Sequence, residues 1–164
     1  IKTSKLKEFP VTVANLKELK EITYQSDNME LAKIKIELPA LEKLVIKNTM
    51  LNNIDSCWNI NLFQNLKELE IRNINVNEQI KSISELEQLQ TLILFDTELN
   101  EIPKSFSNLR YLKYLYLERN KIEKIPEFIS EFKHLKYLRL RWNPIKEGKE
   151  NLKDLPFKVE VSIY

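Results

Sequence analysis

The sequence predicts an α/β solenoid, in which stacked repeats place about seven parallel strands on a concave face and short helical or extended segments on the convex face. The first observation is a pattern that occurs twice, as Leu112-x-x-Leu115-x-Leu117-x-x-Asn120 and Leu135-x-x-Leu138-x-Leu140-x-x-Asn143. The second is that corresponding residues of the two copies lie 23 positions apart, a period typical of solenoids. The third is the alternation of apolar and other residues within each copy, which indicates a short strand with one buried face.

The remaining strands follow from the same pattern at slightly variable spacing. Their apolar anchors are Leu19, Ile22 and Tyr24; Leu41, Leu44 and Ile46; Leu66, Leu69 and Ile71; Leu89, Leu92 and Leu94; and Val159, Val161 and Ile163. We therefore expect one repeat domain spanning residues 1–164. It would comprise a partial repeat at 1–15, repeats from about 16 to 150, and a C-terminal terminating strand within 151–164.

The N-terminal part departs from the pattern in two places. Segment 6–13 matches 99–106, so the chain starts within a repeat, and no strand is expected before that segment. The stretch 54–63 is the most irregular outer segment, and Cys57 and Trp58 are expected to pack there. A reactive thiol is the alternative, but no flanking His or Lys is present to lower the pKa of the cysteine.

A second apolar set lies between the predicted strands and should cover the other side of the core. Its members include Ile102, Phe106, Leu109, Ile125, Ile129 and Phe132. Pro103 and Pro126 stand within these segments, and proline favours turns and short helical pieces over long helices. Since the chain has a single Gly, its other turns must rely on Asn, Asp, Ser and Pro.

The last residue of the repeated pattern predicts a polar ladder inside the solenoid. An Asn side chain there is expected to bond backbone groups of neighbouring turns and so to satisfy buried polar atoms. In chain order the position holds Asp27, Thr49, Ile74, Thr97, Asn120 and Asn143. Asp and Thr can replace part of these hydrogen bonds and Ile none, so the ladder should be regular only towards the C-terminal end.

Composition excludes several kinds of site. Lys and Arg total 26 and Asp and Glu 24, and this net charge of +2 is too balanced to predict nucleic-acid binding. No apolar run reaches the roughly 18 residues that a membrane-spanning helix needs. Cys57 is the single cysteine and His134 the single histidine, which excludes an internal disulfide and a protein zinc site. We therefore expect no metal and no cofactor.

Catalytic groupings are weak, and no enzyme activity is expected. Glu68 and Glu70 resemble a carboxylate pair on one outward face. Lys47 and Arg72 stand close enough to neutralise them, and an open sheet provides no pocket. A serine–histidine–aspartate site would need His134, which stands at a strand entrance, and one Gly cannot make a glycine-rich phosphate loop.

The outward residues of the predicted strands would line the concave face, and their character changes along the chain. The first three strands present small and charged residues of both signs, whereas the next three gather the aromatic and arginine side chains that are enriched at binding hot spots. We predict a partner-binding surface, named here the aromatic–arginine patch, made of Ile93, Phe95, Tyr114, Tyr116, Glu118, Arg119, Tyr137, Arg139, Arg141 and Trp142. The alternative is that cross-strand pairs, such as Tyr114 with Tyr137 or Tyr116 with Arg139, only stabilise the sheet.

The pattern, the period and the outer segments together resemble the leucine-rich-repeat family, in its 23-residue class with outer segments of the Ile-Pro-x-x-[Ile/Phe] type. Similar repeats occur in plant ras-group-related proteins, in animal scaffold proteins and in bacterial families, including those of spirochaetes. The resemblance implies a horseshoe-shaped solenoid, protein recognition and no intrinsic catalysis. Low glycine with abundant Lys, Ile and Asn resembles the proteins of AT-rich bacteria, and a secreted or cell-surface bacterial protein is favoured over a cytoplasmic one.

We therefore expect a non-catalytic interaction module that binds a partner protein or peptide on its concave face. One alternative is a structural or targeting repeat segment of a longer effector or scaffold protein. Another is an oligonucleotide or glycan reader that uses the Tyr and Arg side chains as a stacking platform, which the acidic residues Glu68, Glu70, Asp96 and Glu118 on the same face disfavour. Self-association through open solenoid ends is also expected where those ends expose apolar side chains.

Overall fold

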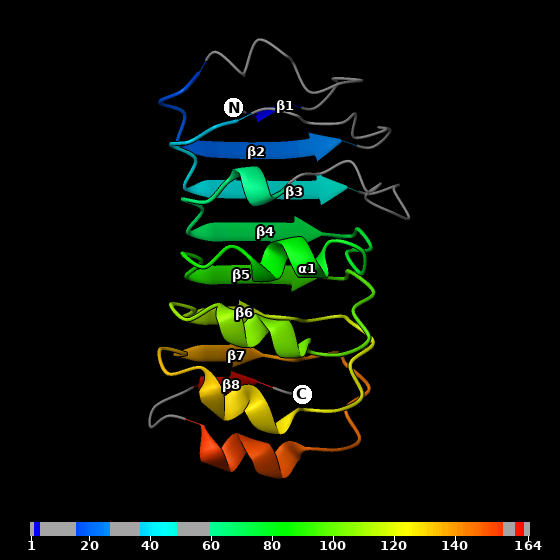
Figure 1. Ribbon diagram of the computed structural model, residues 1–164. Helices are drawn as coiled ribbons and strands as arrows, with labels where there is room; N and C mark the ends of the chain where they lie inside the picture. Colours follow the sequence, from blue (N-terminus) through cyan, green and yellow to red (C-terminus); the bar gives the residue numbers. More distant parts are fainter. Residues whose placement is uncertain (1, 4–15, 27–36, 49–59, 156–159, 163–164) are drawn as a thin grey trace.

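The fold is one parallel sheet whose strands follow each other in chain order (Figure 1). In the computed structural model the described residues are 2–3, 16–26, 37–48, 60–155 and 160–162. Within these ranges the eight strands are β1 (Lys2–Thr3), β2 (Glu21–Ser26), β3 (Lys43–Asn48), β4 (Glu68–Arg72), β5 (Thr91–Phe95), β6 (Tyr114–Tyr116), β7 (Tyr137–Arg139) and β8 (Glu160–Ser162). The predicted solenoid of parallel strands is confirmed.

Strand β1 corrects the expectation that no strand precedes the first partial repeat. Lys2 pairs with Thr23 and Thr3 with Tyr24, in parallel orientation. Parallel pairing uses backbone N–H and C=O groups, so two residues can form it without the leucine pattern that marks the other strands. A prediction based on that pattern therefore missed it.

The strands share one register, which places equivalent repeat positions side by side. Leu69 pairs with Leu92, Leu92 with Leu115, and Leu115 with Leu138. Since neighbouring strands lie about 4.8 Å apart, equivalent side chains form rows across the sheet. The leucine rows are buried, and the rows that alternate with them form the outward face of the sheet.

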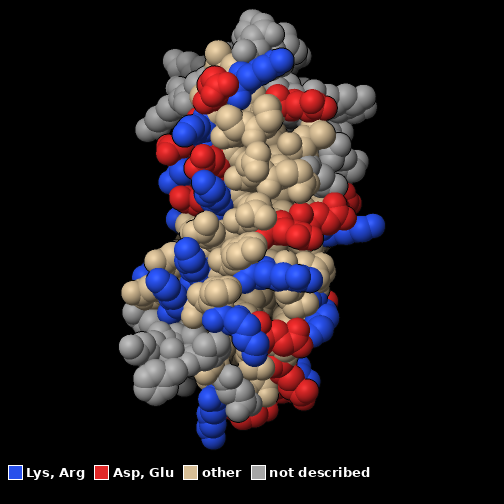
Figure 2. Space-filling model, turned by 60° about the vertical axis from the view of Figure 1, so that its left-hand side comes forward, with Lys and Arg blue, Asp and Glu red and all other residues tan. Residues whose placement is uncertain are grey.

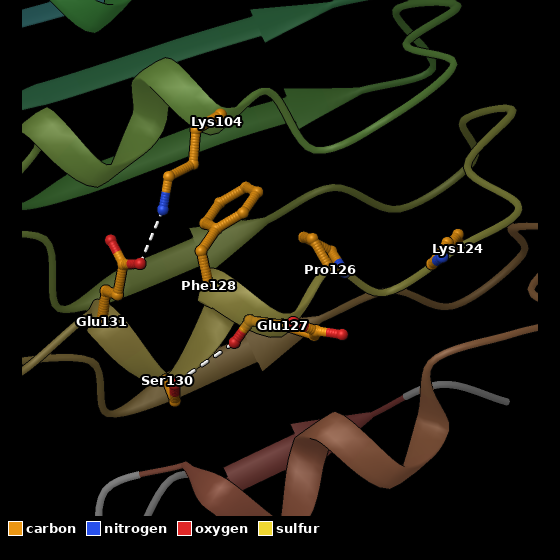
Figure 3. Close-up of a pocket in the computed structure, with 7 residues that line it drawn as sticks. All are labelled: Lys104, Lys124, Pro126, Glu127, Phe128, Ser130 and Glu131. Carbon is orange, nitrogen blue, oxygen red and sulfur yellow. Dashed lines mark hydrogen bonds and ion pairs between the residues drawn. The ribbon is translucent and has the colours of Figure 1, made fainter.

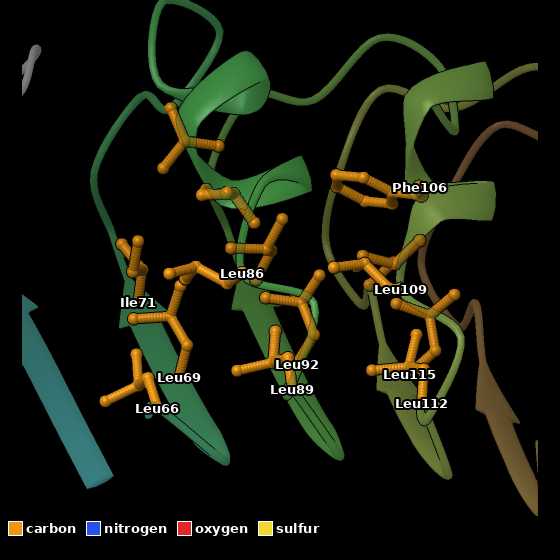
Figure 4. Packing of buried hydrophobic residues seen from close by; sticks show 14 of the residues in the cluster. Leu66, Leu69, Ile71, Leu86, Leu89, Leu92, Phe106, Leu109, Leu112 and Leu115 are labelled. Carbon is orange, nitrogen blue, oxygen red and sulfur yellow. The ribbon is translucent and has the colours of Figure 1, made fainter. Parts of the chain in front are cut away.

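Short helical segments lie across the core from the sheet (Figures 1 and 4). They are η2 (Ile60–Leu62), α1 (Ile80–Ser84), η3 (Lys104–Asn108), η4 (Glu127–Glu131) and η5 (Lys149–Asp154). Pro103 and Pro126 stand directly before η3 and η4, with φ of −68° and −75°, as their positions in the sequence predict. The predictions for Asp27, Thr49, Cys57, Trp58, Val159 and Ile163 lie outside the described residues.

The core is a continuous apolar layer between the sheet and these segments (Figure 4). Leu69, Leu92 and Leu115 from the strands and Phe106 and Leu109 from the convex side are fully buried. All six residues that were expected to cover the core from the convex side are buried. Because each repeat buries its apolar surface mainly against its neighbours, the repeats depend on one another for stability.

The polar ladder makes the expected hydrogen bonds at Asn120, whose side chain is buried. Its Oδ1 accepts from the backbone N–H groups of Thr97 and Leu99 at 3.0 and 3.1 Å. Its Nδ2 donates to the carbonyl oxygens of Leu94 and Leu117 at 2.8 and 2.9 Å. One amide therefore joins two consecutive repeats.

Asn143 repeats this arrangement one turn later, with a half-buried side chain. Its Oδ1 accepts from Ile122 N at 3.1 Å, and its Nδ2 donates to Leu117 O and Leu140 O at 2.8 and 3.0 Å. Ile74 occupies the same position in an earlier repeat and is buried, so it contributes packing only. The ladder is therefore regular at the two C-terminal positions, as expected.

Candidate functional site

The aromatic–arginine patch lies on the outward side of β5, β6 and β7 and on the residues that follow these strands. Leu115 is buried in the middle of β6, so its neighbours Tyr114 and Tyr116 project to the opposite, outward face. Strand β7 repeats the arrangement with Tyr137 and Arg139. The structure thus brings these predicted residues together on adjacent strands.

Side chains of β6 and β7 make both of the cross-strand pairs that the sequence predicts. Tyr114 stacks on Tyr137, with ring centroids 5.3 Å apart and an interplanar angle of 15°. The Arg139 guanidinium lies 4.8 Å from the centre of the Tyr116 ring. Each pair occupies opposed positions in the register. Such contacts stabilise the sheet and also hold the side chains in defined positions.

A second row of contacts runs along the ends of the strands, where arginines and aromatic rings alternate. The guanidinium groups of Arg72 and Arg119 lie 4.9 and 5.8 Å from the centre of the Phe95 ring. Those of Arg119 and Arg141 lie 5.5 and 5.1 Å from the Trp142 ring. These residues form a chain of contacts from the end of β4 to the end of β7, and Arg72 belongs to it although the sequence did not place it in the patch.

The backbone before the ladder position is left-handed in four consecutive repeats. The residues there are Asn73, Asp96, Arg119 and Trp142, with φ from 55° to 59°. This conformation costs most L-residues roughly 1–2 kcal/mol, whereas the short side chains of Asn and Asp tolerate it. Backbone preference therefore explains Asn73 and Asp96 but not Arg119 and Trp142.

The patch presents arginines that have no carboxylate partner within the described part of the chain. Arg119, Arg139 and Arg141 are exposed, and each lies over a ring rather than within 4.0 Å of a described Asp or Glu. Arg72 differs, because its Nε bonds Glu70 Oε1 at 2.5 Å. A guanidinium can bind a carboxylate through two parallel hydrogen bonds. Three such groups are thus available to a partner.

Ile93 and Glu118 complete the patch and are half-buried. Ile93 stands between Glu70 and Tyr116 in the register. The carbonyl of Glu118 accepts the N–H of Asp96 at 3.1 Å. Burial raises the pKa of the Tyr116 phenol, so its hydroxyl is protonated at neutral pH and can donate a hydrogen bond.

The N-terminal half of the same face is neutralised by ion pairs. Lys43 lies 2.7 Å from Glu68, and Lys47 lies 3.1 Å from Glu70. Burial opposes ionisation of Glu70, but hydrogen bonds from Arg72 and Lys47 outweigh it and hold its pKa below the ordinary value. The predicted neutralisation is confirmed for Glu70, whereas Glu68 pairs with Lys43 instead. Two carboxylates that are each paired with a lysine do not form a general acid–base pair.

The convex side has a shallow hollow next to η3 and η4 (Figure 3). It has a volume of about 470 Å³ and is lined by Lys104, Lys124, Pro126, Glu127, Phe128, Ser130 and Glu131. Lys104 Nζ bonds Glu131 Oε1 at 2.6 Å and lies 4.7 Å from the centre of the Phe128 ring. These polar groups bond one another rather than converge on the hollow, so we interpret it as a seam between neighbouring repeats.

The described residues also lack two other kinds of feature. No three of their His, Cys, Asp or Glu side chains gather as a metal site requires. None of their helices combines the length and the apolar character that crossing a membrane demands. His134 stacks against Tyr111, with ring centroids 6.3 Å apart.

A group of side chains at the entrances of β6 and β7 was not predicted. We name it the entrance cluster, and it consists of Arg110, Tyr111, Lys113, Lys133, His134 and Lys136. These residues precede the strands, so a search of outward strand positions does not find them. The signal in the sequence is the 23-residue spacing, which aligns each basic residue of one repeat with a basic residue of the next.

Comparison with known proteins identifies the class of protein. Residues 48–157 match the model of a family described as a leucine-rich repeat region. With the stacked parallel strands and the asparagine ladder, this match shows that the chain belongs to the leucine-rich-repeat family. A search of curated proteins found no match. Members of the family are generally non-enzymatic modules that bind proteins or peptides.

Three solved structures illustrate the similarity. A leucine-rich-repeat protein of Leptospira interrogans is 30% identical with a TM-score of 0.71, over 92% of this chain and 38% of that one. An internalin of Listeria monocytogenes is 20% identical with a TM-score of 0.65, over 99% of this chain and 53% of that one. The ectodomain of the Arabidopsis thaliana membrane receptor kinase GASSHO1/SCHENGEN3 is 17% identical with a TM-score of 0.54, over 99% of this chain and 22% of that one. The chain thus spans about half or less of the length of these proteins.

Proposed function

We propose that this chain binds a partner protein or peptide through the aromatic–arginine patch on the outward face of its sheet. The observation that carries the proposal is the presence of Arg119 and Trp142 at left-handed backbone positions, where Asn73 and Asp96 stand in the preceding repeats. Strained positions of this kind cluster at functional sites. Asn would suit the backbone better at these two positions. The large side chains that stand there instead support a role in contact with a partner.

The geometry of the patch supports the same proposal. Trp142 is 57% exposed and offers a large apolar contact area. Arg119 and Arg141 already lie against its ring, so little conformational entropy would be lost when a partner docks. The family supports the type of partner, and the Arabidopsis ectodomain is in complex with CASPARIAN STRIP INTEGRITY FACTOR 2 in its structure.

The proposal is tested by substitutions that weaken binding and preserve the fold. Trp142→Asn introduces the residue type that stands at the equivalent position 73. It should change the free energy of unfolding by less than about 1 kcal/mol, since relief of backbone strain offsets the lost cation–π contacts. It should weaken binding of a captured partner by about 2 kcal/mol or more, and so should Tyr116→Ala.

Matched controls lie at the other end of the same face. Lys43→Ala and Gln25→Ala change outward residues of β2 and β3, and each should alter binding by less than about 0.5 kcal/mol. The measurement is a pull-down with quantified recovery, followed by calorimetry on the purified partner. Loss of binding in the β2 and β3 variants, with unchanged binding in the patch variants, would show that the patch only stabilises the sheet.

A further inference from the structure

We infer that the partner contributes an acidic, extended polypeptide segment that crosses the outward face along β6 and β7, from the entrance cluster to Trp142. This inference rests on the proposed function and adds the chemistry of the partner and a second contact surface. It follows from the positions of cations that have no carboxylate partner among the described residues, and from the surface that joins those positions.

The entrance cluster is a local positive surplus in a chain that is otherwise balanced. Arg110, Lys133 and Lys136 are exposed, and Lys113 is half-buried. Within the described residues none of the four lies within 4.0 Å of a carboxylate, and Lys113 Nζ donates instead to the neutral amide Gln90 Oε1 at 2.9 Å. Figure 2 turns this side of the molecule towards the reader, and basic side chains gather over its lower half.

Several lysines elsewhere on the described surface pair with carboxylates of a neighbouring repeat. Such pairs are Lys67 with Glu42, Lys104 with Glu131, Lys121 with Glu98, and Lys146 with Glu123, at 2.6–3.3 Å. Lys67 occupies the same repeat position as Lys113 and Lys136, so the position alone does not create the surplus. These four carboxylates are already paired and are therefore not free to bind the entrance cluster of a second copy of this chain.

The entrance cluster and the aromatic–arginine patch form one band across the sheet. Lys136 directly precedes Tyr137, and Arg139, Arg141 and Trp142 follow along the same repeat. At about 3.3 Å per residue the band from Lys136 to Trp142 measures roughly 20 Å, which an extended segment of about six or seven residues can span. Cations and rings alternate along it, so a segment that alternates carboxylates with flat apolar residues would match.

Charge within the band favours a polypeptide over a single-stranded nucleic acid. Asp96 and Glu118 lie on the same face, next to Phe95 and Arg119. A nucleic-acid backbone carries a negative charge at every nucleotide and would meet these carboxylates, whereas a polypeptide can place a neutral residue against them. Nucleic acid is therefore a comparison ligand in the test.

The probe is a labelled peptide of about eight residues that alternates glutamate and proline. Such a peptide is extended, at about 3.1 Å per residue, and suits aromatic-lined surfaces. A peptide of the same length that alternates lysine and proline, and an oligouridylate of equal length, are the comparison ligands. Association and dissociation rates are measured at about 0.05 M and about 0.5 M salt, because screening separates surface charge effects from close contacts.

The double substitution Lys133→Gln with Lys136→Gln should lower the association rate constant about threefold to tenfold at low salt. This difference in association rate constant between the variant and the wild type should largely disappear at high salt. Trp142→Asn should instead raise the dissociation rate about tenfold or more, because it removes a large aromatic contact. The matched control is Lys20→Gln with Lys67→Gln, two lysines that both pair with Glu42, and it should leave both rates within about twofold.

The outcomes separate this inference from the proposed function. If the Lys133 and Lys136 variant keeps its rates while Trp142→Asn weakens binding, the inference of an acidic partner segment is wrong and the proposed patch stands. No binding of the glutamate–proline peptide, or equal binding of the lysine–proline peptide, would also overturn the inference. Tighter binding of the oligouridylate would assign the band to nucleic acid. If the peptide binds and neither variant affects it, both the inference and the proposed patch fail.

Discussion

Asn120→Ala should cause a large loss of stability through hydrogen bonding rather than through packing. The asparagine side chain bonds the N–H groups of Thr97 and Leu99 and the carbonyl oxygens of Leu94 and Leu117. In the alanine variant only Leu117 O keeps a side-chain partner, since Asn143 also donates to it. An unsatisfied buried group costs about 1–3 kcal/mol, so three of them predict a loss of about 3 kcal/mol or more.

Urea unfolding followed by circular dichroism measures this loss, and two other asparagines calibrate it. Asn143→Ala should cost less, about 1–2 kcal/mol, because its Oδ1 accepts from one backbone N–H and its side chain is partly exposed. Asn65→Ala removes an exposed bond to Pro39 O and should cost less than about 1 kcal/mol. A loss below about 1 kcal/mol for Asn120→Ala, or a larger loss for Asn143→Ala, would refute the assigned hydrogen bonds.

Three further predictions test the core, a turn and an ion pair. Leu115→Ala should lower the free energy of unfolding by about 2–5 kcal/mol, because the side chain is fully buried, and a loss below about 1 kcal/mol would show that the strand register is wrong. Gly148→Ala should cost more than about 1 kcal/mol in the same assay, since φ is +81° and the added Cβ would come within 1.9 Å of Ile125 O. Glu70 has a lowered pKa in the folded chain, so its stabilising contribution is present above the unfolded pKa and is lost as pH falls through the folded one. The stability gap between wild type and Glu70→Gln should therefore narrow below about pH 4 in acid unfolding, and a constant gap would contradict the ion pair.

The sequence predicted most of the fold because one constraint repeats in every turn. Each leucine must reach the same core, so the spacing of apolar residues also determines the register, as the pairing of Leu92 with Leu115 and of Leu115 with Leu138 shows. Strand β1 was not predicted, because its two residues lack the leucine pattern that marks the other strands. The extent of the domain and the location of the protein stay predictions.

The candidate site was predicted in its residue types but only partly in its contacts. Opposed positions in a sheet follow directly from the repeat spacing, so the contact of Tyr116 with Arg139 could be anticipated. The contacts around Trp142 depend on a left-handed backbone that spacing does not reveal. The sequence also does not predict which lysines form ion pairs. Lys67 and Lys113 share one repeat position, but of the two only Lys67 lies close to a described carboxylate.

The left-handed positions also connect the polar ladder to the proposed binding surface. Asp96 N donates to Glu118 O at 3.1 Å, and Arg119 N donates to Arg141 O at 3.0 Å, so each of these strained residues is bonded to the next repeat. Asn120 directly follows Arg119, and its Nδ2 donates to the carbonyl of Glu118 at 3.3 Å. This hydrogen bond holds the backbone next to position 119 from its buried side. The repeat architecture therefore imposes the conformation at position 119, and the side chain there is available for binding. Asn120→Ala should then weaken both stability and binding without touching a partner, whereas Trp142→Asn should weaken binding alone.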